Sequence, residues 1–288
     1  MQLQDGRTLE YMDNGVTGDS RKKAIIFHHG TPGSCTSWHS WLTMCAEMGI
    51  RALSYSRAGY GQSSRRKGRS VVDNNDDISE LLSAKEISTF VSIGLSGGGP
   101  HSLVQTLDHR NVGAISLAGV GAYGVPDLDF MAGQGPENIE EWAAALAGEE
   151  TLEKWMEANG SGLRTITAAG IIEALGGLIG APDKAILTND VAEDFAADFR
   201  HALSISYTGW MDDDFAFMRD WGIDLSAITK PVQLWQGDED FMVPHAHGIW
   251  LKSKIPTATL NFVPGEGHLS LGIKKRREIL DQAKALLA

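Results

Sequence analysis

Short apolar runs alternate with helical patterns along most of the chain, and this alternation restricts the possible folds more than any other feature. Four strands are predicted before residue 125, at 24–28, 50–55, 90–95 and 112–120, with helices between them. Beyond Lys230 the alternation returns, with strands at 231–235 and 259–263 and helices at 245–253 and 271–287. Strands that alternate with helices favour a parallel sheet with helices on both faces, so the predicted fold class is α/β.

Residues 126–225 interrupt this alternation with helical patterns only. Helices are predicted at 139–146, 152–158, 168–179 and 191–207. The same segment contains 20 Asp and Glu but only 5 Lys and Arg, whereas the rest of the chain has 17 acids and 20 bases. The break in both pattern and charge predicts two units: a core formed by residues 1–125 and 226–288, and an inserted, acidic, all-helical unit formed by residues 126–225.

Composition excludes several classes of protein. The formal net charge of −12 argues against nucleic acids and anionic membranes as partners. The two cysteines, Cys35 and Cys45, are too few for a disulfide framework or a structural zinc site. No apolar stretch is long enough to span a bilayer, and the first residues lack the pattern of a signal peptide, so a cytoplasmic location is expected.

Gly94-Leu95-Ser96-Gly97-Gly98 is a Gly-x-Ser-x-Gly pentapeptide directly between a predicted strand and a predicted helix. Such a sharp turn leaves no room for larger side chains beside the serine, because they would collide with the strand or the helix. By itself the pentapeptide is a weak signal and also fits an ordinary glycine-rich turn. Its position predicts that Ser96 is a nucleophile at the sheet edge, with Gly94 and Gly98 shaping the turn.

A serine hydroxyl needs a base to become a nucleophile, and the base needs an acid to orient it. Among nine histidines, His268 is the favoured base, because it follows a late strand in a tight loop from which an imidazole can reach across the sheet edge. His101 lies five residues beyond Ser96 in the same helix and is expected to point away. His28 and His29 precede a loop and are expected to order it, and His245 and His247 are expected at a helix start as exposed or capping residues.

The candidate acids cluster after the strand that ends at Trp235. A carboxylate there would share the sheet edge with the serine and the histidine, where open α/β sheets bind their ligands. The pattern leaves three candidates open, and the two that are not used are expected to be solvated: Asp238, Glu239 and Asp240.

The oxyanion of an acyl-transfer reaction needs backbone N–H groups that converge on one point. The loop His28–Ser34 follows the first clear strand and would supply the Thr31 N–H, and Gly97, directly after the serine, would supply a second. Taken alone, this loop also reads as a plain Gly/Pro connection.

Together these segments resemble the α/β-hydrolase family over residues 1–125 and 226–288. The matching motifs follow the family's order, Ser then Asp then His: His29-Gly30, Gly59-Tyr60-Gly61-Gln62-Ser63, the pentapeptide at 94–98, Gly-x-x-Asp-x-x-x-Pro at 237–244 and Gly-x-Gly-His at 265–268. The resemblance implies an α/β-hydrolase fold, a helical cap at 126–225, and Asp240 as the acid of a Ser96–Asp240–His268 triad. One departure is Tyr55–Gly59, where relatives often have Asp-Arg-Pro-Gly.

The resemblance implies a cofactor-free serine hydrolase, and the predicted function is cleavage of small, neutral esters. Ser96 at the position of an aspartate argues against haloalkane dehalogenases and epoxide hydrolases. The loop 29–33 resembles that of proline iminopeptidases, which hold an amino terminus with acidic cap residues, so such an aminopeptidase is the alternative, although Gly97 stands where those enzymes have Trp. Less favoured are a C–C bond hydrolase, a lactonase, a cofactor-free haloperoxidase and a non-catalytic ligand receptor.

The acidity of residues 126–225 has two interpretations. The first is surface charge that keeps the protein soluble, and the second is a field that repels anionic substrates. Asp212, Asp213 and Asp214 follow one another on one helix and are expected to point in different directions, so no metal site is predicted. The tryptophans of the segment are expected to anchor the core: Trp142, Trp155, Trp210 and Trp221.

Overall fold

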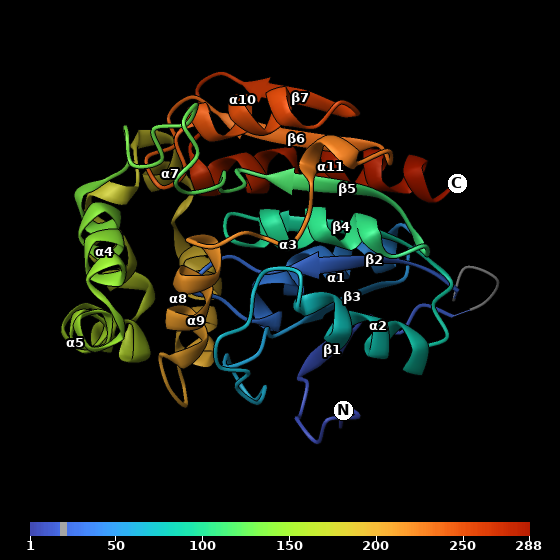
Figure 1. Cartoon of the computed structure of the whole chain (residues 1–288), viewed down its shortest axis with the longest axis horizontal. Helices are drawn as coiled ribbons and strands as arrows, with labels where there is room; N and C mark the ends of the chain where they lie inside the picture. Colours follow the sequence, from blue (N-terminus) through green and yellow to red (C-terminus); the bar gives the residue numbers. More distant parts are fainter. Residues whose placement is uncertain (18–21) are drawn as a thin grey trace.

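The computed structural model describes residues 1–17 and 22–288 and has a seven-stranded sheet between two layers of helices (Figure 1). The strand order is β1-β3-β2-β4-β5-β6-β7. Only β1 is antiparallel to its neighbour, and the other strands are parallel. The strands are β1 (Tyr11–Asp13), β2 (Lys23–His28), β3 (Ala52–Tyr55), β4 (Thr89–Leu95), β5 (Asn111–Leu117), β6 (Val232–Gly237) and β7 (Ala258–Val263). The predicted mostly parallel α/β sheet is therefore confirmed.

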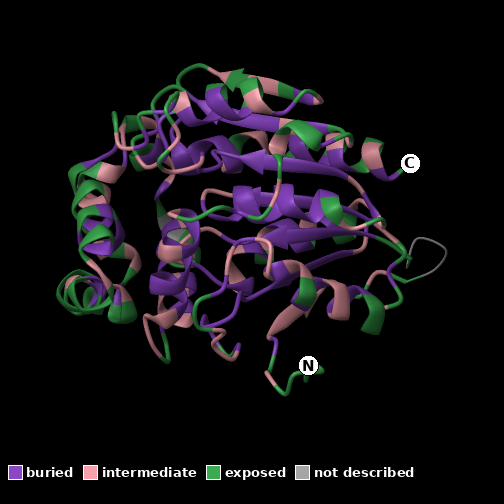
Figure 2. Ribbon diagram, viewed as in Figure 1, coloured by how far each residue is buried: buried purple, intermediate pink, exposed green. Residues whose placement is uncertain are grey.

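Both faces of the sheet are buried, which explains why its strands are continuous apolar runs (Figure 2). On one face, Ile25 and Phe27 pack with helices α1 (His39–Glu47) and α11 (His268–Leu287). On the other face, Ala24 and Ile26 and their neighbours pack against three helices: α2 (Asn74–Ala84), α3 (Gly98–Val104) and α10 (His245–Lys254).

The order of the strands creates a switch point between β2 and β4. The chain goes from β2 to β3 on one side and then crosses back to β4 on the other side, so the loops that follow β2 and β4 diverge. His28 at the end of β2 is paired with Gly94 near the end of β4. Open α/β sheets bind ligands in the crevice at such a point. The predicted nucleophile turn and the predicted oxyanion loop are the two segments that meet there.

Residues 126–225, the cap segment, connect β5 to β6 and contain helices but no strand in the part that the structure describes. These helices stand at the left of Figure 1, beyond the carboxyl ends of the parallel strands. They are α4 (Pro136–Ala147), α5 (Glu149–Asn159), α6 (Ile171–Leu175), α7 (Ala181–Ile186), α8 (Asn189–Ala202) and α9 (Thr208–Phe217). None of the helices in the described ranges has both the length and the apolar character needed to cross a membrane.

The predicted boundaries are wrong at two places in the cap segment. The helix predicted at 168–179 is broken into α6 and two flanking 3₁₀ turns, since Gly176 adopts a φ of +48°. The helix predicted at 191–207 ends at Ala202, and α9 follows as a separate helix, which carries the three aspartates expected on one helix but whose bounds the sequence pattern did not indicate. Most of α9 is buried, including three aspartates, so it lacks the polar face by which an amphipathic helix is recognised.

Candidate active site

Ser96 lies in the turn between β4 and α3, with its backbone in the left-handed region at a φ of +56°. This conformation is strained for a residue with a side chain, at about 1–3 kcal/mol, and the surrounding backbone holds it in place. The Ser96 N–H donates to the Leu117 carbonyl oxygen at 2.9 Å. A Cβ on Gly94 would collide with the backbone of Gly98, and one on Gly98 with the carbonyl of His28. Glycine at both positions is therefore a steric requirement of the turn.

The loop after β6 and the start of α11 bring Asp240 and His268 together. The two side chains meet at 2.9 Å between His268 Nδ1 and Asp240 Oδ2, and both are buried. The other oxygen of Asp240 accepts the N–H groups of Met242 and Val243 at 3.0 and 2.8 Å. These bonds fix the carboxylate, so that it orients the imidazole and leaves Nε2 available for another partner.

Asp240 is the buried member of the three candidate acids, whereas Asp238 and Glu239 are exposed. The Asp238 carboxylate accepts the Gly265 N–H at 2.6 Å and thereby joins its loop to the one that precedes His268. Of the three, Asp240 is the carboxylate that bonds to His268, and the other two lie in a solvated turn.

The environment of His268 favours its charged form. Burial alone would lower the pKa of this imidazole, but the negative charge of Asp240, the hydrogen bond to it and the charge of Asp183 raise the pKa above its ordinary value. A base with a raised pKa accepts a proton readily and stabilises the imidazolium that forms when it does.

Thr31 and Gly97 lie against each other beside Ser96, and all three line one cavity. A Cβ on Gly97 would collide with the Thr31 side chain, and a Cβ on Gly30 would lie 3.5 Å from the Ser96 Cβ. The structure thus brings the loop after β2 to the nucleophile turn. That the Thr31 and Gly97 amides bind an oxyanion stays a prediction.

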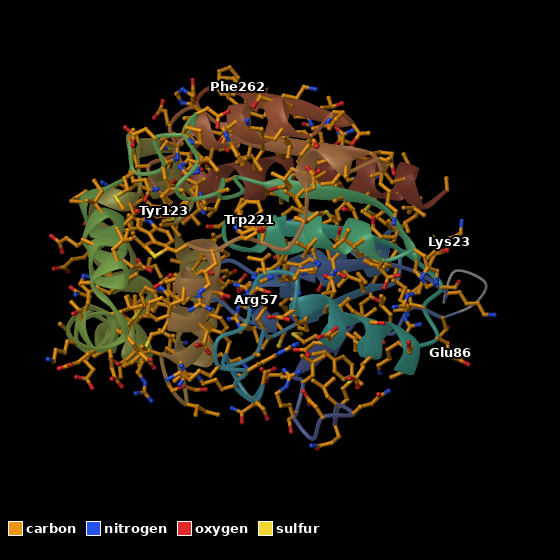
Figure 3. All side chains as sticks on the ribbon, in the orientation of Figure 1. Lys23, Arg57, Glu86, Tyr123, Trp221 and Phe262 are labelled. Carbon is orange, nitrogen blue, oxygen red and sulfur yellow. The ribbon has the colours of Figure 1, made fainter. Side chains whose placement is uncertain are left out.

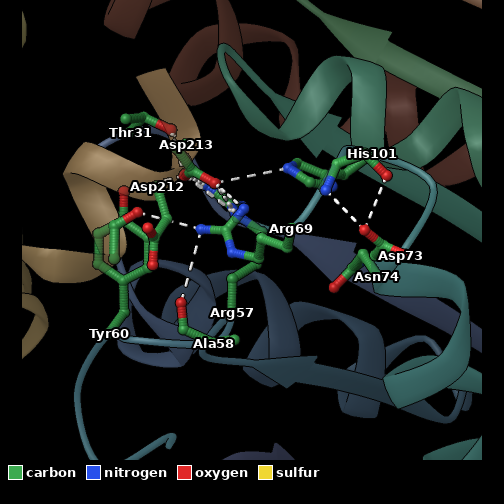
Figure 4. A network of polar contacts seen from close by, with 12 residues as sticks. Thr31, Arg57, Ala58, Tyr60, Arg69, Asp73, Asn74, His101, Asp212 and Asp213 are labelled. Carbon is green, nitrogen blue, oxygen red and sulfur yellow. Dashed lines mark hydrogen bonds and ion pairs between the residues drawn. The ribbon is translucent and has the colours of Figure 1, made fainter. Parts of the chain in front are cut away.

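A buried polar network holds this loop in place (Figure 4). The Arg57 guanidinium donates to Asp213 Oδ2 at 2.6 Å, to the carbonyl oxygen of Gly30 at 2.9 Å and to Thr31 Oγ1 at 3.0 Å. Thr31 in turn donates to Asp213 at 2.8 Å, and Arg69 pairs with the same carboxylate. Since Asp213 belongs to helix α9, the network joins the cap segment to the candidate oxyanion loop.

Arg57 lies deep inside the molecule, whereas the labelled Lys23 and Glu86 lie at its edge (Figure 3). Burial alone would raise the pKa of Asp213, but the charges of Arg57 and Arg69 hold it well below its ordinary value, so this carboxyl is ionised. Sequence reasoning saw Arg57 only as part of a departure from the family pattern and missed the network. The available signal was a run of three aspartates in a helix without a polar face.

The other histidines have structural positions. His29 accepts the backbone N–H of Arg57 at 3.0 Å and bonds to the Gly30 carbonyl oxygen at 2.7 Å, so it orders the loop as expected, whereas His28 bonds to the Tyr55 hydroxyl of β3 at 2.7 Å. His101 lies 3.7 Å from Asp213 and does not line the cavity. His245 is exposed, as expected. His247 is buried, so the prediction that it is an exposed or capping residue was wrong.

His247 is fully buried and lines the cavity. It accepts the Gly121 N–H at 3.0 Å and bonds to the carbonyl oxygen of Phe130 at 3.0 Å. Burial lowers its pKa to about 4, so the ring is neutral and ties the start of the cap segment to α10. The helical pattern placed His247 near a helix start, but only the packing of the cap segment against α10 buries it.

Ser96 and His268 open onto a cavity of about 590 Å³ between the sheet edge and the cap segment. This volume lies within the range of small-molecule sites. Much of its lining is apolar, and three tryptophans expected to anchor the core contribute to it: Trp142, Trp155 and Trp210. Trp221 packs in the core as expected.

The polar lining of the cavity is acidic. Seven carboxyl side chains of the cap segment line it: Glu137, Glu140, Glu141, Asp190, Asp194, Asp198 and Asp214. Among the described residues of the lining, Arg276 is the single lysine or arginine. Six acids of the cap segment are buried, so the interpretation of its acidity as surface charge is wrong for these: Glu141, Asp183, Asp198, Asp212, Asp213 and Asp214.

Glu141 and Asp214 form a buried pair in the wall of the cavity. The Trp210 indole donates to Glu141, whereas both Asp214 oxygens lack a hydrogen-bond donor among the described residues. Burial raises the pKa of Glu141 to about 7, and burial together with the charges of Glu141 and Asp213 raises the pKa of Asp214 well above its ordinary value. The pair therefore retains a proton near neutral pH.

One further group of side chains has potential metal-ligand atoms within 4.8 Å of one another: Glu10, Cys35 and His201. Glu10 already accepts from the Ser56 hydroxyl at 2.7 Å and bonds to His201 at 2.9 Å. Burial raises the pKa of Cys35 to about 12, so it remains a thiol rather than the thiolate that binds metals. Glu10, directly before β1, and His201 of α8 thus form a hydrogen-bonded link, and with the Cys35 thiol they fit this role better than a metal site.

Known proteins share the fold of this chain. The family model for the alpha/beta hydrolase fold matches residues 23–148. A non-heme haloperoxidase of Rhodococcus erythropolis is 25% identical over 271 residues, which cover 92% of this chain and 90% of that protein. Two solved structures cover nearly all of this chain: an enol-lactonase from Burkholderia xenovorans (TM-score 0.71, 18% identity, 98% of this chain and 97% of the other) and an esterase from Exiguobacterium antarcticum (TM-score 0.68, 16% identity, 100% and 98%).

Proposed function

We propose that this chain, whose residues 23–148 match the family model for the alpha/beta hydrolase fold, is a serine hydrolase that cleaves small carboxylic esters through an acyl-enzyme. One observation carries the proposal. A strained serine, Ser96, opens onto the same cavity as His268, and a buried carboxylate, Asp240, holds that imidazole. A nucleophile, a base and an orienting acid in this relation are the parts of acyl transfer.

In the proposed mechanism, Ser96 Oγ attacks the ester carbonyl carbon while His268 Nε2 accepts the hydroxyl proton. The carbonyl oxygen becomes an oxyanion, which the Thr31 and Gly97 amides stabilise. As the carbon–oxygen bond breaks, His268 returns the proton to the leaving alcohol. Water then attacks the acyl-enzyme, again giving its proton to His268, and the acid leaves as Ser96 is restored.

The acidic lining of the cavity supports a neutral acyl group as the substrate. A carboxylate substituent on the acyl chain would enter a space with seven carboxyl side chains and one arginine. Like charges in a confined site of low dielectric disfavour such a ligand. The tryptophans and aliphatic side chains of the lining provide apolar contact area for a neutral group.

The substitution Ser96→Ala tests the proposal. Against p-nitrophenyl acetate and butyrate, we expect kcat to fall at least ~10³-fold without loss of folding, since the oxyanion donors and the cavity remain. Ser83→Ala, which removes an exposed hydroxyl on α2, serves as the matched control and keeps full activity. Near wild-type turnover by a clean Ser96→Ala preparation would refute the assignment. Bromination in the presence of hydrogen peroxide tests the activity that gives the haloperoxidase relative its name.

The buried Glu141–Asp214 pair favours a second candidate, an aminopeptidase. Carboxyl groups in the wall of a cavity can bind the ammonium group of an amino terminus, and both Asp214 oxygens lack a donor among the described residues. L-Prolyl and L-alanyl anilides test this candidate in the same assay. Fast anilide cleavage with weak ester turnover would favour the aminopeptidase, and the reverse would favour the esterase.

A further inference from the structure

Asp183, in the short helix α7 of the cap segment, contacts the first residues of α11. Its carboxylate accepts three backbone N–H groups, from His268 at 3.1 Å, Leu269 at 2.9 Å and Ser270 at 2.8 Å. The side chain is fully buried. A residue 85 positions earlier in the chain therefore caps the helix that carries the candidate base.

Helix α11 depends on this contact because its own cap residue has no side chain. The first N–H groups of a helix have no partner within the helix, and a capping side chain usually accepts one or two of them. At this helix the N-cap residue is Gly267. Asp183 supplies the missing acceptor for three amides at once, and one of them belongs to His268 itself.

The glycine is also what allows Asp183 to approach. A Cβ on Gly267 would lie 2.5 Å from the Asp183 carboxylate, a distance that requires one of them to move. Directly after His268, Leu269 packs with apolar side chains of α6 and α8, so the cap segment holds this end of α11 by apolar contact as well. The second glycine of Gly265-Glu266-Gly267-His268 thus has a specific steric role.

We propose that Asp183 is a positioning residue for the base: it fixes the start of α11 so that His268 stays against Asp240, and it places a second negative charge beside the imidazole. Through this contact the cap segment, besides enclosing the cavity, helps to assemble the catalytic site. The consequence for catalysis rests on the proposed function, whereas the contact and its effect on the imidazole do not.

The electrostatic argument follows from where His268 lies. As the first residue of α11 it lies at the positive end of the helix dipole, a place that disfavours a cationic imidazolium. Asp183 offsets that field with its negative charge, and no lysine or arginine of the described ranges neutralises it. Burial raises the pKa of Asp183, while its hydrogen bonds and the charge of His268 act to lower it.

Other ionisable groups lie on the elements near His268. Asp240 bonds to the imidazole from the loop after β6, and His247 on α10, which lines the same cavity, is neutral. On the α11 side, Glu266 is paired with Lys274 at 2.9 Å. Neither Asp183 nor Asp240 has a lysine or arginine partner among the described residues, so removal of either negative charge is expected to make the imidazolium less stable.

The direct test is an NMR titration of the His268 imidazole in the full-length protein, with its resonance assigned by loss in His268→Gln. In Asp183→Asn the amide oxygen still caps the helix but the charge is gone, so we expect the midpoint to move to lower pH than in the wild type. Asp224→Asn is the matched control and should leave the midpoint unchanged. Asp224 also caps a short helix, but it is exposed and its charge does not act on His268. An unchanged midpoint in Asp183→Asn would overturn the proposal.

Gly267→Ala provides an independent variant should Asp183→Asn fail to fold. The added methyl displaces the Asp183 carboxylate while leaving its charge in the protein, and the midpoint of His268 is again expected to fall. In ester hydrolysis, we expect Asp183→Asn to lower kcat about 10-fold with little change in KM and to move the inflection of the pH–rate profile to lower pH. An inactive wild type would refute the proposed function, while the titration would still decide the role of Asp183.

Discussion

The loops at the sheet edge and the cap segment both contribute to the candidate active site, but in different ways. At the sheet edge, short loops after strands supply Ser96, Asp240 and His268, and backbone geometry sets their positions. The cap segment supplies carboxylates and tryptophans from helices, and side-chain packing sets their positions. Each candidate catalytic residue therefore depends on the geometry of its own loop, whereas the cavity around them depends on contacts between distant segments.

The two regions also differ in the partners of their buried carboxylates. At the sheet edge, the Asp240 carboxylate is satisfied by two backbone amides and the base. In the cap segment, Asp213 is paired with two arginines, whereas Glu141 and Asp214 share the cavity wall without a cation. Buried carboxylates are therefore of two kinds here: those held ionised by partners, and a pair that keeps a proton.

The largest effect, on kcat, is expected for the substitution of Asp240 at the sheet edge. Asp240→Asn should lower kcat by on the order of 10⁴-fold, because an amide favours the wrong imidazole tautomer. Asp238→Asn, the matched change at an exposed carboxylate two residues earlier, should leave turnover close to that of the wild type. Steady-state hydrolysis of p-nitrophenyl butyrate measures both. Severe loss in Asp238→Asn with an active Asp240→Asn would show that the loop carries the acid two residues earlier.

A smaller effect, on stability, is expected from the buried Glu141–Asp214 pair of the cap segment. Its folded-state pKa values lie above those of unfolded chains, so the folded protein binds more protons, and the free energy of unfolding falls as the pH rises from about 5 through about 7. Asp214→Asn should make this decline in the free energy of unfolding shallower, because it removes one of the two carboxyl groups whose pKa is raised.

Urea denaturation at pH 5, 6, 7 and 8 provides the measurement. Glu153→Gln, at an exposed position on α5, is the control and should follow the wild-type curve. Parallel pH dependence of all three proteins would mean that the pair does not retain its proton, and the distinction between the two kinds of carboxylate would fail.

The smallest effect concerns the charge of the substrate. A neutral ester should be cleaved with a higher kcat/KM than its carboxylate-bearing analogue at low salt, and the difference should shrink as salt is added, since exposed charges are screened within ~10 Å at 0.1 M. Asp194→Asn, at the exposed rim of the cavity, should improve the anionic ester about 2–3-fold.

Glu157→Gln, an exposed change outside the cavity lining, should leave the ratio of the two substrates unaltered. Equal rates for the neutral and anionic esters at low salt would show that the acidic lining of the cavity does not select substrates by their charge.

Local sequence patterns were sufficient to predict the nucleophile turn and much of the sheet. Gly94 and Gly98 are required by sterics within a few residues of Ser96, and the apolar runs of the strands follow from burial on both faces. Candidate residues at the strand ends could be proposed because parallel strands bring their carboxyl ends to one edge. The pattern alone could not choose among Asp238, Glu239 and Asp240, and their different burial supplies the physical reason for the choice.

Periodicity and short-range sterics are encoded in the sequence, so the class of sheet, the turn at Ser96 and the set of residues that could act there could be predicted from it. The role of each charge in the cap segment depends on tertiary contacts and could not be predicted. Asp183, Asp213 and Asp214 are chemically identical in the sequence, yet one caps α11, one binds two arginines and one faces the cavity. Such differences arise from partners tens to hundreds of residues away, which no local pattern records.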